Sequence, residues 1–251
     1  MKQHPEGVGV YCRGQDPRPG VMRAAKVRWA ALMVETAHGA VTPLSTLVRH
    51  ARLARQGGAE QVWLWALHGP AAANEGKQAA ARLTRHLAAL SADGVILDIE
   101  ASHKGKPLAC RELVSATLDG LTERTGLGVT SYPLAAAHPT MPWAEMRAGW
   151  GSPQCYATAG SDARSHRAVE EWRAWHGGEG YAKPRVVIPS LACYETTSPG
   201  EGVAQLRGDL ERVCTTEGVV DVPGICLWSE PQLSLTEAVE LGEFARRAGW
   251  A

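Results

Sequence analysis

Residues 92–102 read ADGVILDIEAS, an apolar run that ends in two carboxylates. The run is rich in Val, Ile and Leu, which is typical of a strand buried on both faces. Since side chains alternate between the two faces of a strand, Asp98 and Glu100 lie on the same face, with Cα atoms roughly 6–7 Å apart. Paired carboxylates of this kind cleave glycosidic bonds, one as the acid and the other as base, nucleophile or stabiliser. A helix cap and a salt bridge are the alternative interpretation of the pair.

Strand-like runs of this type recur along the chain and alternate with helical patterns. They cover residues 8–12, 27–35, 61–67, 94–100, 126–132, 149–156, 185–194 and 224–228. Between them, apolar residues recur at the i, i+3, i+4 and i+7 spacing of an amphipathic helix. Alternating strands and helices form βαβ units, and eight such units in about 250 residues fit a closed (β/α)8 TIM barrel. We therefore predict one domain over residues 1–251, with stunted helices in the short, Pro-rich connectors after the first and fifth strands.

Composition and charge limit the partners of the chain. Lys and Arg total 26, as do Asp and Glu, so no net field favours nucleic acid or an anionic membrane. No run approaches the roughly 20 apolar residues of a membrane span, and the first residues lack the apolar segment of a signal peptide. We expect synthesis in the cytoplasm, with any release to the cell wall by a non-Sec route. Nine Trp and five Tyr against one Phe hint at ligand stacking, although several Trp belong to the core.

The carboxyl ends of the predicted strands carry the residues of interest, because barrel enzymes place their active sites there. Nearly every strand ends in a polar or aromatic residue that can touch a sugar. In chain order these are Tyr11, Arg13 and Asp16; Glu35; Trp65 and His68; Asp98 and Glu100; Tyr132; Gln154 and Tyr156; Tyr194 and Glu195; and Trp228 and Glu230.

Metal and cofactor signals are weak in this sequence. No two of the six cysteines lie two to four residues apart, and the first strand carries no His-x-His pair. No G-x-G-x-x-G follows the first strand, which counts against a dinucleotide fold. We therefore predict no metal and no organic cofactor. A barrel enzyme that binds a metal through Glu35, Glu100 and Glu195 is the least favoured alternative.

At three places the chain resembles the family 18 glycoside hydrolases, the chitinases and endo-β-N-acetylglucosaminidases. Residues 93–100, DGVILDIE, are similar to the Asp-Gly-x-Asp-x-Asp-x-Glu motif of the fourth barrel strand in that family. Gln154-Cys155-Tyr156 resembles its Gln-x-Tyr segment on strand six, and residues 224–228 resemble its Gly-x-x-x-Trp on strand eight. The clear matches cover some twenty residues, whereas the predicted barrel covers the whole chain.

Two departures from this pattern keep other interpretations open. Ile96 stands in place of the inner Asp of the motif, which in the family exchanges a hydrogen bond with the next Asp, and Ala157 replaces the Asp that follows the Gln-x-Tyr segment. Family 25 lysozymes, which are also barrels with Asp-x-Glu on a strand, are the rival resemblance. A catalytically inactive barrel that binds glycan or serves as a structural protein, in a phage tail or secretion assembly, is the alternative function.

The resemblance implies a role for each candidate residue. Glu100 is the expected general acid, and Asp98 the residue that stabilises either the substrate's acetamido group or the oxocarbenium ion. Tyr156 is expected to hydrogen-bond the acetamide, and Trp228 to stack under the sugar ring. The remaining substrate-binding candidates are Gln154, Tyr11, Asp16, Glu35, Trp65, Tyr132 and Glu195. The expected substrate is a glycan with N-acetylated sugars, of the peptidoglycan or chitin type, cleaved as by a chitinase, a lysozyme or a phage endolysin.

Overall fold

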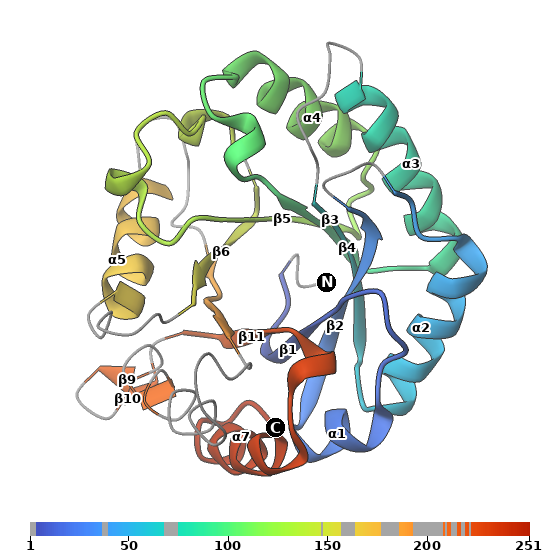
Figure 1. Ribbon diagram of the computed structural model, residues 1–251, viewed down its shortest axis with the longest axis vertical. Coiled ribbons are helices and arrows are strands. Elements are labelled where there is room, and N and C mark those ends of the chain that lie inside the picture. The colour runs from blue at the N-terminus through green and yellow to red at the C-terminus, as the bar shows by residue number, and fades with distance from the viewer. Residues whose placement is uncertain are drawn as a thin grey trace.

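The computed structural model is a closed parallel β-barrel ringed by helices (Figure 1). It describes residues 4–36, 40–67, 75–146, 148–156, 164–176, 186–192, 208, 210–211, 215–216, 219–220 and 222–251. The predicted (β/α)8 class is therefore confirmed.

The barrel wall is one sheet of parallel strands. Its strands are β1 (Gly7–Cys12), β2 (Val27–Glu35), β3 (Gln61–Leu67), β4 (Gly94–Asp98), β5 (Gly126–Ser131), β6 (Trp150–Cys155), β7 (Val186–Val187), β8 (Ser190–Ala192) and β11 (Gly224–Trp228). They follow the order β5-β4-β3-β2-β1-β11-β8-β6-β7, and the pairing of β5 with β6 closes the barrel.

The seventh predicted strand is split into two short pieces. β7 pairs with the start of β6, and β8 pairs with both the end of β6 and β11. Pro189 lies between the pieces and has no backbone N–H to donate to a ladder, which explains the interruption. The two pieces together form one wall segment, so the barrel has eight strands. A short antiparallel pair, β9 (Thr215–Thr216) with β10 (Val219–Val220), was not predicted.

The helices cover the outside of the barrel, as Figure 1 shows. They are α1 (Pro19–Ala24), α2 (Leu44–Gln56), α3 (Glu75–Leu90), α4 (Pro107–Asp119), α5 (Arg164–His176) and α7 (Leu235–Arg247). The expected stunting is confirmed, because α1 has six residues and the described residues between β5 and β6 form just two 3-10 turns, Ala135–Ala137 and Trp143–Glu145. Within the described residues, none of these helices is long and apolar enough to cross a membrane.

Three Trp–Gly pairs fill the amino-terminal end of the barrel. Trp29 is the register partner of Gly9, Trp63 of Gly94 and Trp150 of Gly128. The indole of Trp150 meets those of Trp29 and Trp63 edge to face, with ring centroids 5.8 and 5.3 Å apart. A Cβ atom at Gly9 would lie 1.9 Å from the Trp29 ring, and one at Gly128 would lie 2.3 Å from the Trp150 ring. Only glycine leaves room for these indoles, which close this end and leave the opposite end for a site.

Candidate functional site

A cavity of about 260 Å³ opens at the carboxyl ends of the barrel strands. Its lining combines charged and polar groups with aromatic and aliphatic ones: Arg13, Met33, Thr36, Trp65, Leu67, Asp98, Glu100, Gln154, Tyr156 and Trp228. A larger cavity of about 300 Å³ lies between Leu210 and helix α7, away from the barrel axis. The carboxylates of β4 make the barrel cavity the candidate active site.

Asp98 and Glu100 are joined by the side-chain amide of Gln154. Gln154 Nε2 donates one hydrogen bond of 3.0 Å to Asp98 Oδ1 and another of 2.7 Å to Glu100 Oε1. The second oxygen of Asp98 accepts a 3.2 Å hydrogen bond from Trp65 Nε1. Asp98 is 2% exposed, whereas Glu100 is half-buried at the cavity wall. β4 ends at Asp98, two residues before the predicted end, but the backbone at Glu100 is still extended, so both carboxyls reach the cavity, Asp98 deeper than Glu100.

The environment of Asp98 favours its protonated form. Burial raises the pKa of Asp98 well above its usual range, and the Glu100 carboxyl raises that pKa further through its charge and a hydrogen bond. The N–H donors of Trp65 and Gln154 act in the opposite direction, because they stabilise the ionised carboxylate. Asp98 therefore holds its proton to a higher pH than an ordinary aspartic acid does.

Three tyrosines surround the two carboxyls. Burial raises the pKa of Tyr11, Tyr156 and Tyr132, and the charge of Asp98 contributes to all three shifts. Tyr11 is 1% exposed, and its hydroxyl lies beside the side chains of Ser190 and Thr130, which lower its pKa by hydrogen bonding. The Tyr132 hydroxyl accepts a hydrogen bond from the backbone N–H of Ala101, next to Glu100. All three phenols therefore remain neutral and serve as hydrogen-bonding groups.

Trp228 forms one wall of the cavity at the end of β11. Its ring is half-buried and meets Tyr11 and Trp65 edge to face, at centroid distances of 5.3 and 5.0 Å. Tyr156 lies 6.2 Å from it at a tilt of 33°. The Trp228–Ser229 peptide bond is cis. The aromatic contacts fix the indole while part of it remains accessible from the cavity, as a stacking surface for a sugar requires.

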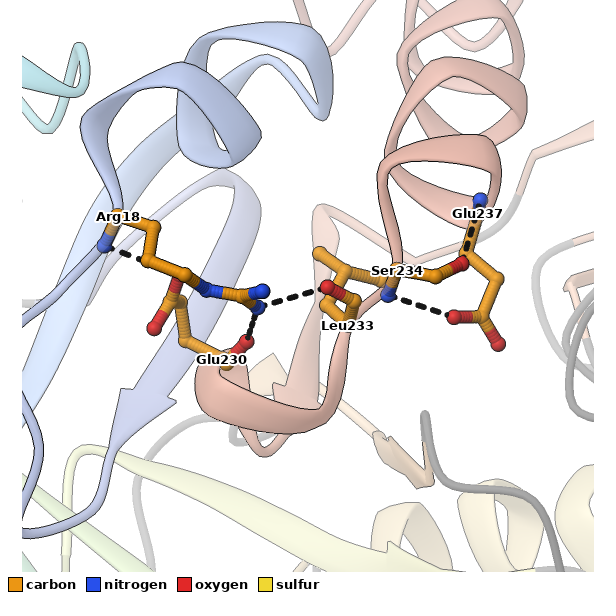
Figure 2. A network of polar contacts seen from close by, with 5 residues as sticks. All are labelled: Arg18, Glu230, Leu233, Ser234 and Glu237. Carbon is orange, nitrogen blue, oxygen red and sulfur yellow. Dashed lines mark hydrogen bonds and ion pairs between the residues drawn. The ribbon is translucent and has the colours of Figure 1, made fainter.

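The loop that follows Trp228 is anchored by Arg18 (Figure 2). The backbone N–H and Nε of Arg18 each donate a 3.1 Å hydrogen bond to Glu230 Oε1, and Nη2 donates to the Glu230 carbonyl and, at 2.7 Å, to the Leu233 carbonyl. Glu230 is fully buried, and that burial raises its pKa although Arg18 opposes the shift. A capping box between Ser234 and Glu237 then starts α7. Glu230 is thus an anchor of the loop and does not line the cavity.

Several expected site residues lie elsewhere. The Asp16 carboxylate is paired with Arg49 at 2.9 Å and with His50 at 3.2 Å. Glu35 is buried and accepts two hydrogen bonds from Arg82, of 3.0 and 2.9 Å. The register shifts between Met33 and Glu35, so Glu35 pairs with Ala66 and leaves the inner face.

Tyr132 adjoins Glu100 without lining the cavity. His68, Tyr194 and Glu195 lie outside the described residues. Among the described residues, no group of three or more His, Cys, Asp or Glu side chains is placed to hold a metal ion. With Glu35 paired to Arg82, the arrangement does not fit a metal bound by Glu35, Glu100 and Glu195.

Met33, Thr36 and Leu67 line the cavity although they were not among the candidates. The alternation of side chains along a strand could have predicted two of them. Met33 continues the inward series Trp29 and Ala31, and Leu67 continues the inward series Trp63 and Trp65. Thr36 lies beyond the end of β2, where that period no longer applies.

Comparison with known proteins gives structural matches only. No family model matches the sequence, and no curated protein is significantly similar to it. Among solved structures, a GH18 chitinase from Pseudoalteromonas aurantia matches with a TM-score of 0.64 at 11% identity, over 97% of this chain and 99% of that one. The Bacillus cereus spore cortex-lytic enzyme SleL matches with a TM-score of 0.63 at 9% identity, over 97% and 75%. A xylanase and amylase inhibitor protein, XAIP-III, matches with a TM-score of 0.56 at 16% identity, over 98% of both chains. The barrel therefore has the fold of the GH18 chitinases, a fold shared by an inhibitor protein.

Proposed function

We propose that this barrel is a glycoside hydrolase that cleaves a glycan with N-acetylated sugars, with Glu100 as the general acid. The observation that carries the proposal is the bridge from Gln154 to both Asp98 and Glu100 on a cavity wall beside Trp228. The GH18 chitinase and the cortex-lytic enzyme share the fold, which supports a chitin-type or cell-wall glycan as the substrate.

The two carboxyls are suited to different tasks because their surroundings differ. Glu100 is half-buried on the cavity wall, within reach of a leaving oxygen above it. Asp98 lies beneath it with both oxygens held by N–H donors, and its raised pKa keeps a proton available for a hydrogen bond. Pairs of carboxyls in different environments divide the acid and stabilising roles of glycoside hydrolysis. Here the accessible position of Glu100 on the cavity wall assigns it the acid role, and the carboxyl with the raised pKa is Asp98.

Asp98 serves in either of two schemes. In the substrate-assisted scheme it orients the acetamido group, which attacks the anomeric carbon, while Tyr156 hydrogen-bonds the acetamide. In the lysozyme-like scheme Asp98 stabilises the oxocarbenium ion directly, which requires the ionised carboxylate and therefore a pH above its raised pKa. A thiazoline mimic of the acetamide intermediate separates the two, since only an enzyme of the first kind is inhibited at micromolar concentration.

The test is hydrolysis by the Glu100→Gln variant. The amide keeps the size of the side chain but cannot donate the proton, a role usually worth about 10²–10⁴-fold in rate. We expect that loss on chitooligosaccharides or on peptidoglycan, with an unchanged melting temperature. Glu60→Gln, at an exposed carboxylate paired with Arg28 outside the cavity, is the matched control and should retain full activity. Full activity of a well-folded Glu100→Gln variant would remove Glu100 from the mechanism.

A glycan-binding barrel without catalysis is the second candidate. Ile96 stands on the inner face in place of the motif's inner Asp and is fully buried against the aromatic cluster of the barrel interior. The fold is also that of an inhibitor protein. Binding of chitooligosaccharides without measurable hydrolysis by the wild-type chain would favour this candidate.

A further inference from the structure

The Arg13 guanidinium stands over the ring of Trp228 at the cavity. Arg13 follows β1, is exposed, and lines the same cavity as Glu100. Its Cζ atom lies 5.7 Å from the Trp228 ring centroid, within the range of a cation–π contact. In the described part of the chain no carboxylate pairs with Arg13, whereas Arg18, Arg49, Arg82 and Arg111 each have a carboxylate partner. Among the described residues, the positive charge at the stacking surface therefore has no carboxylate partner.

The charges that line the cavity indicate what kind of ligand Arg13 binds. Besides the neutral phenol of Tyr156, the ionisable residues in the described lining are Arg13, Asp98 and Glu100. Asp98 is buried beneath Glu100, so the cavity does not present a pair of negative charges to a ligand. A neutral sugar on Trp228 needs no cation beside it, and no carboxylate of the described residues occupies the N–H fork of Arg13. That fork matches the two oxygens of a carboxylate, to which guanidinium binds in bidentate geometry.

A second cation lies at the same end of the barrel. Lys104 Nζ lies 4.8 Å from the centroid of the Tyr132 ring, which is itself stacked on His138 at 3.9 Å. Lys104 belongs to the loop after β4, and β4 lies three strands from β1 in the barrel order. Each cation thus rests on an aromatic ring, from two separate loops at the carboxyl end. Two separate loops therefore each place a cation at this end of the barrel.

We propose that the sugar stacked on Trp228 carries a carboxylate and that Arg13 binds it, so that the substrate is an acidic glycan. This inference rests on the proposed glycosidase function and adds the chemical class of the substrate to it. A lactyl ether on an amino sugar and a uronic acid both supply such a carboxylate, at different positions of the ring.

The test compares acidic and neutral oligosaccharides on one protein background. Binding is measured by calorimetry to the Glu100→Gln variant, which does not consume the ligand. The ligands are a tetrasaccharide of alternating N-acetylglucosamine and N-acetylmuramic acid, the same compound with its carboxyls reduced, a hyaluronan tetrasaccharide and chitotetraose. We expect the Glu100→Gln protein, in which Arg13 is intact, to bind an acidic ligand with at least about tenfold higher affinity than its neutral counterpart. This difference in affinity should shrink as the salt concentration rises. Whether the lactyl or the uronic ligand binds more tightly identifies the source of the carboxylate.

Variants of Arg13 complete the experiment. Arg13→Leu should reduce the ratio of acidic to neutral affinity to about one, and Arg13→Lys should restore part of that ratio because the charge returns without the bidentate fork. Arg52→Leu, at an exposed arginine on α2, is the control. Equal binding of acidic and neutral ligands, or a preference that survives Arg13→Leu, overturns the inference and leaves the glycosidase proposal standing. Failure of every glycan to bind overturns the proposed function and the inference together.

Discussion

Gln154 Nε2 donates a 3.0 Å hydrogen bond to Asp98 Oδ1 across the mouth of the barrel. The two residues belong to β6 and β4, which are separated by β5 in the sheet. The other hydrogen of the same amide goes to Glu100, so one side chain sets the spacing of both carboxyls.

Replacing Gln154 by Leu should alter the pH dependence of hydrolysis. The N–H donor of Gln154 lowers the pKa of Asp98, so its removal should raise that pKa further. The limb of the kcat/KM profile that reports deprotonation of Asp98 is then expected to move to higher pH, together with an activity loss of about 10–100-fold. A profile of unchanged shape, with lower activity throughout, would indicate that Gln154 only supports the fold.

Asp98 should make the protein less stable as pH rises. The pKa of Asp98 is raised in the folded state, whereas in the unfolded chain it is about 3.9. Between these two pKa values the folded state binds more protons than the unfolded state. The free energy of unfolding therefore falls as pH rises, until the folded-state pKa is passed. The slope in that window is at most about 1.4 kcal/mol per pH unit. Asp98→Asn should remove this decline, even if the amide loses a hydrogen bond from Trp65 or Gln154. Urea unfolding of both proteins from pH 4 to pH 8 measures it; parallel curves would contradict the buried, protonated Asp98.

Ile96→Asp tests the residue that departs from the family motif. Ile96 is fully buried on the inner face, so the new carboxyl should cost about 1–3 kcal/mol in the free energy of unfolding. Tyr11 lies in the same cluster, and its hydroxyl is the expected donor to the new group. In a substrate-assisted enzyme the variant should raise kcat despite this loss, whereas in a lysozyme-like enzyme or a binding protein it should only destabilise. Ile96→Val, expected to cost about 0.5–1.5 kcal/mol, is the control for lost packing.

Gly9→Ala tests the Trp–Gly packing at the amino-terminal end. The added methyl would lie 1.9 Å from the Trp29 ring, so the indole must shift within a filled layer, at a cost of about 1–3 kcal/mol. Gly20→Ala, where no heavy atom lies within 4 Å of the added carbon, is the matched control on α1 and should be neutral or slightly stabilising. Thermal melts of the two variants should therefore differ, and equal melting temperatures would show that the layer is loosely packed.

Arg18→Leu tests the anchor of the loop after Trp228. The change leaves the buried Glu230 carboxyl without the donors of the Arg18 side chain. We expect the free energy of unfolding to fall by about 1–3 kcal/mol. This loss should grow as pH rises, because Glu230 then ionises without a counter-ion. Arg49→Leu is the control, because the partner of Arg49, Asp16, is 51% exposed. This variant should lower the free energy of unfolding by less than about 1 kcal/mol. If the two variants are equally stable at pH 8, the Arg18–Glu230 pair contributes no more than a surface ion pair.

The sequence by itself determined the strands, the class of fold and the common face of Asp98 and Glu100. These features depend on local patterns, namely apolar runs, the period of two and Pro-rich connectors, so they could be predicted without knowing which strands are neighbours. The split at Pro189 and the register shift at Glu35 depend on pairing with β6 and β3, and local patterns do not contain that information.

Only the tertiary structure decided which polar groups meet. The partners of Asp98 lie 33 and 56 residues away, at Trp65 and Gln154, and Asp16 and Glu35 are drawn to Arg49 and Arg82 on helices outside the barrel. Barrel closure and helix packing bring such residues together, and a buried polar group then takes the hydrogen-bond partner that this geometry supplies. The sequence therefore predicts carboxylates at the carboxyl ends of the strands, and the long-range packing determines which of them line the cavity.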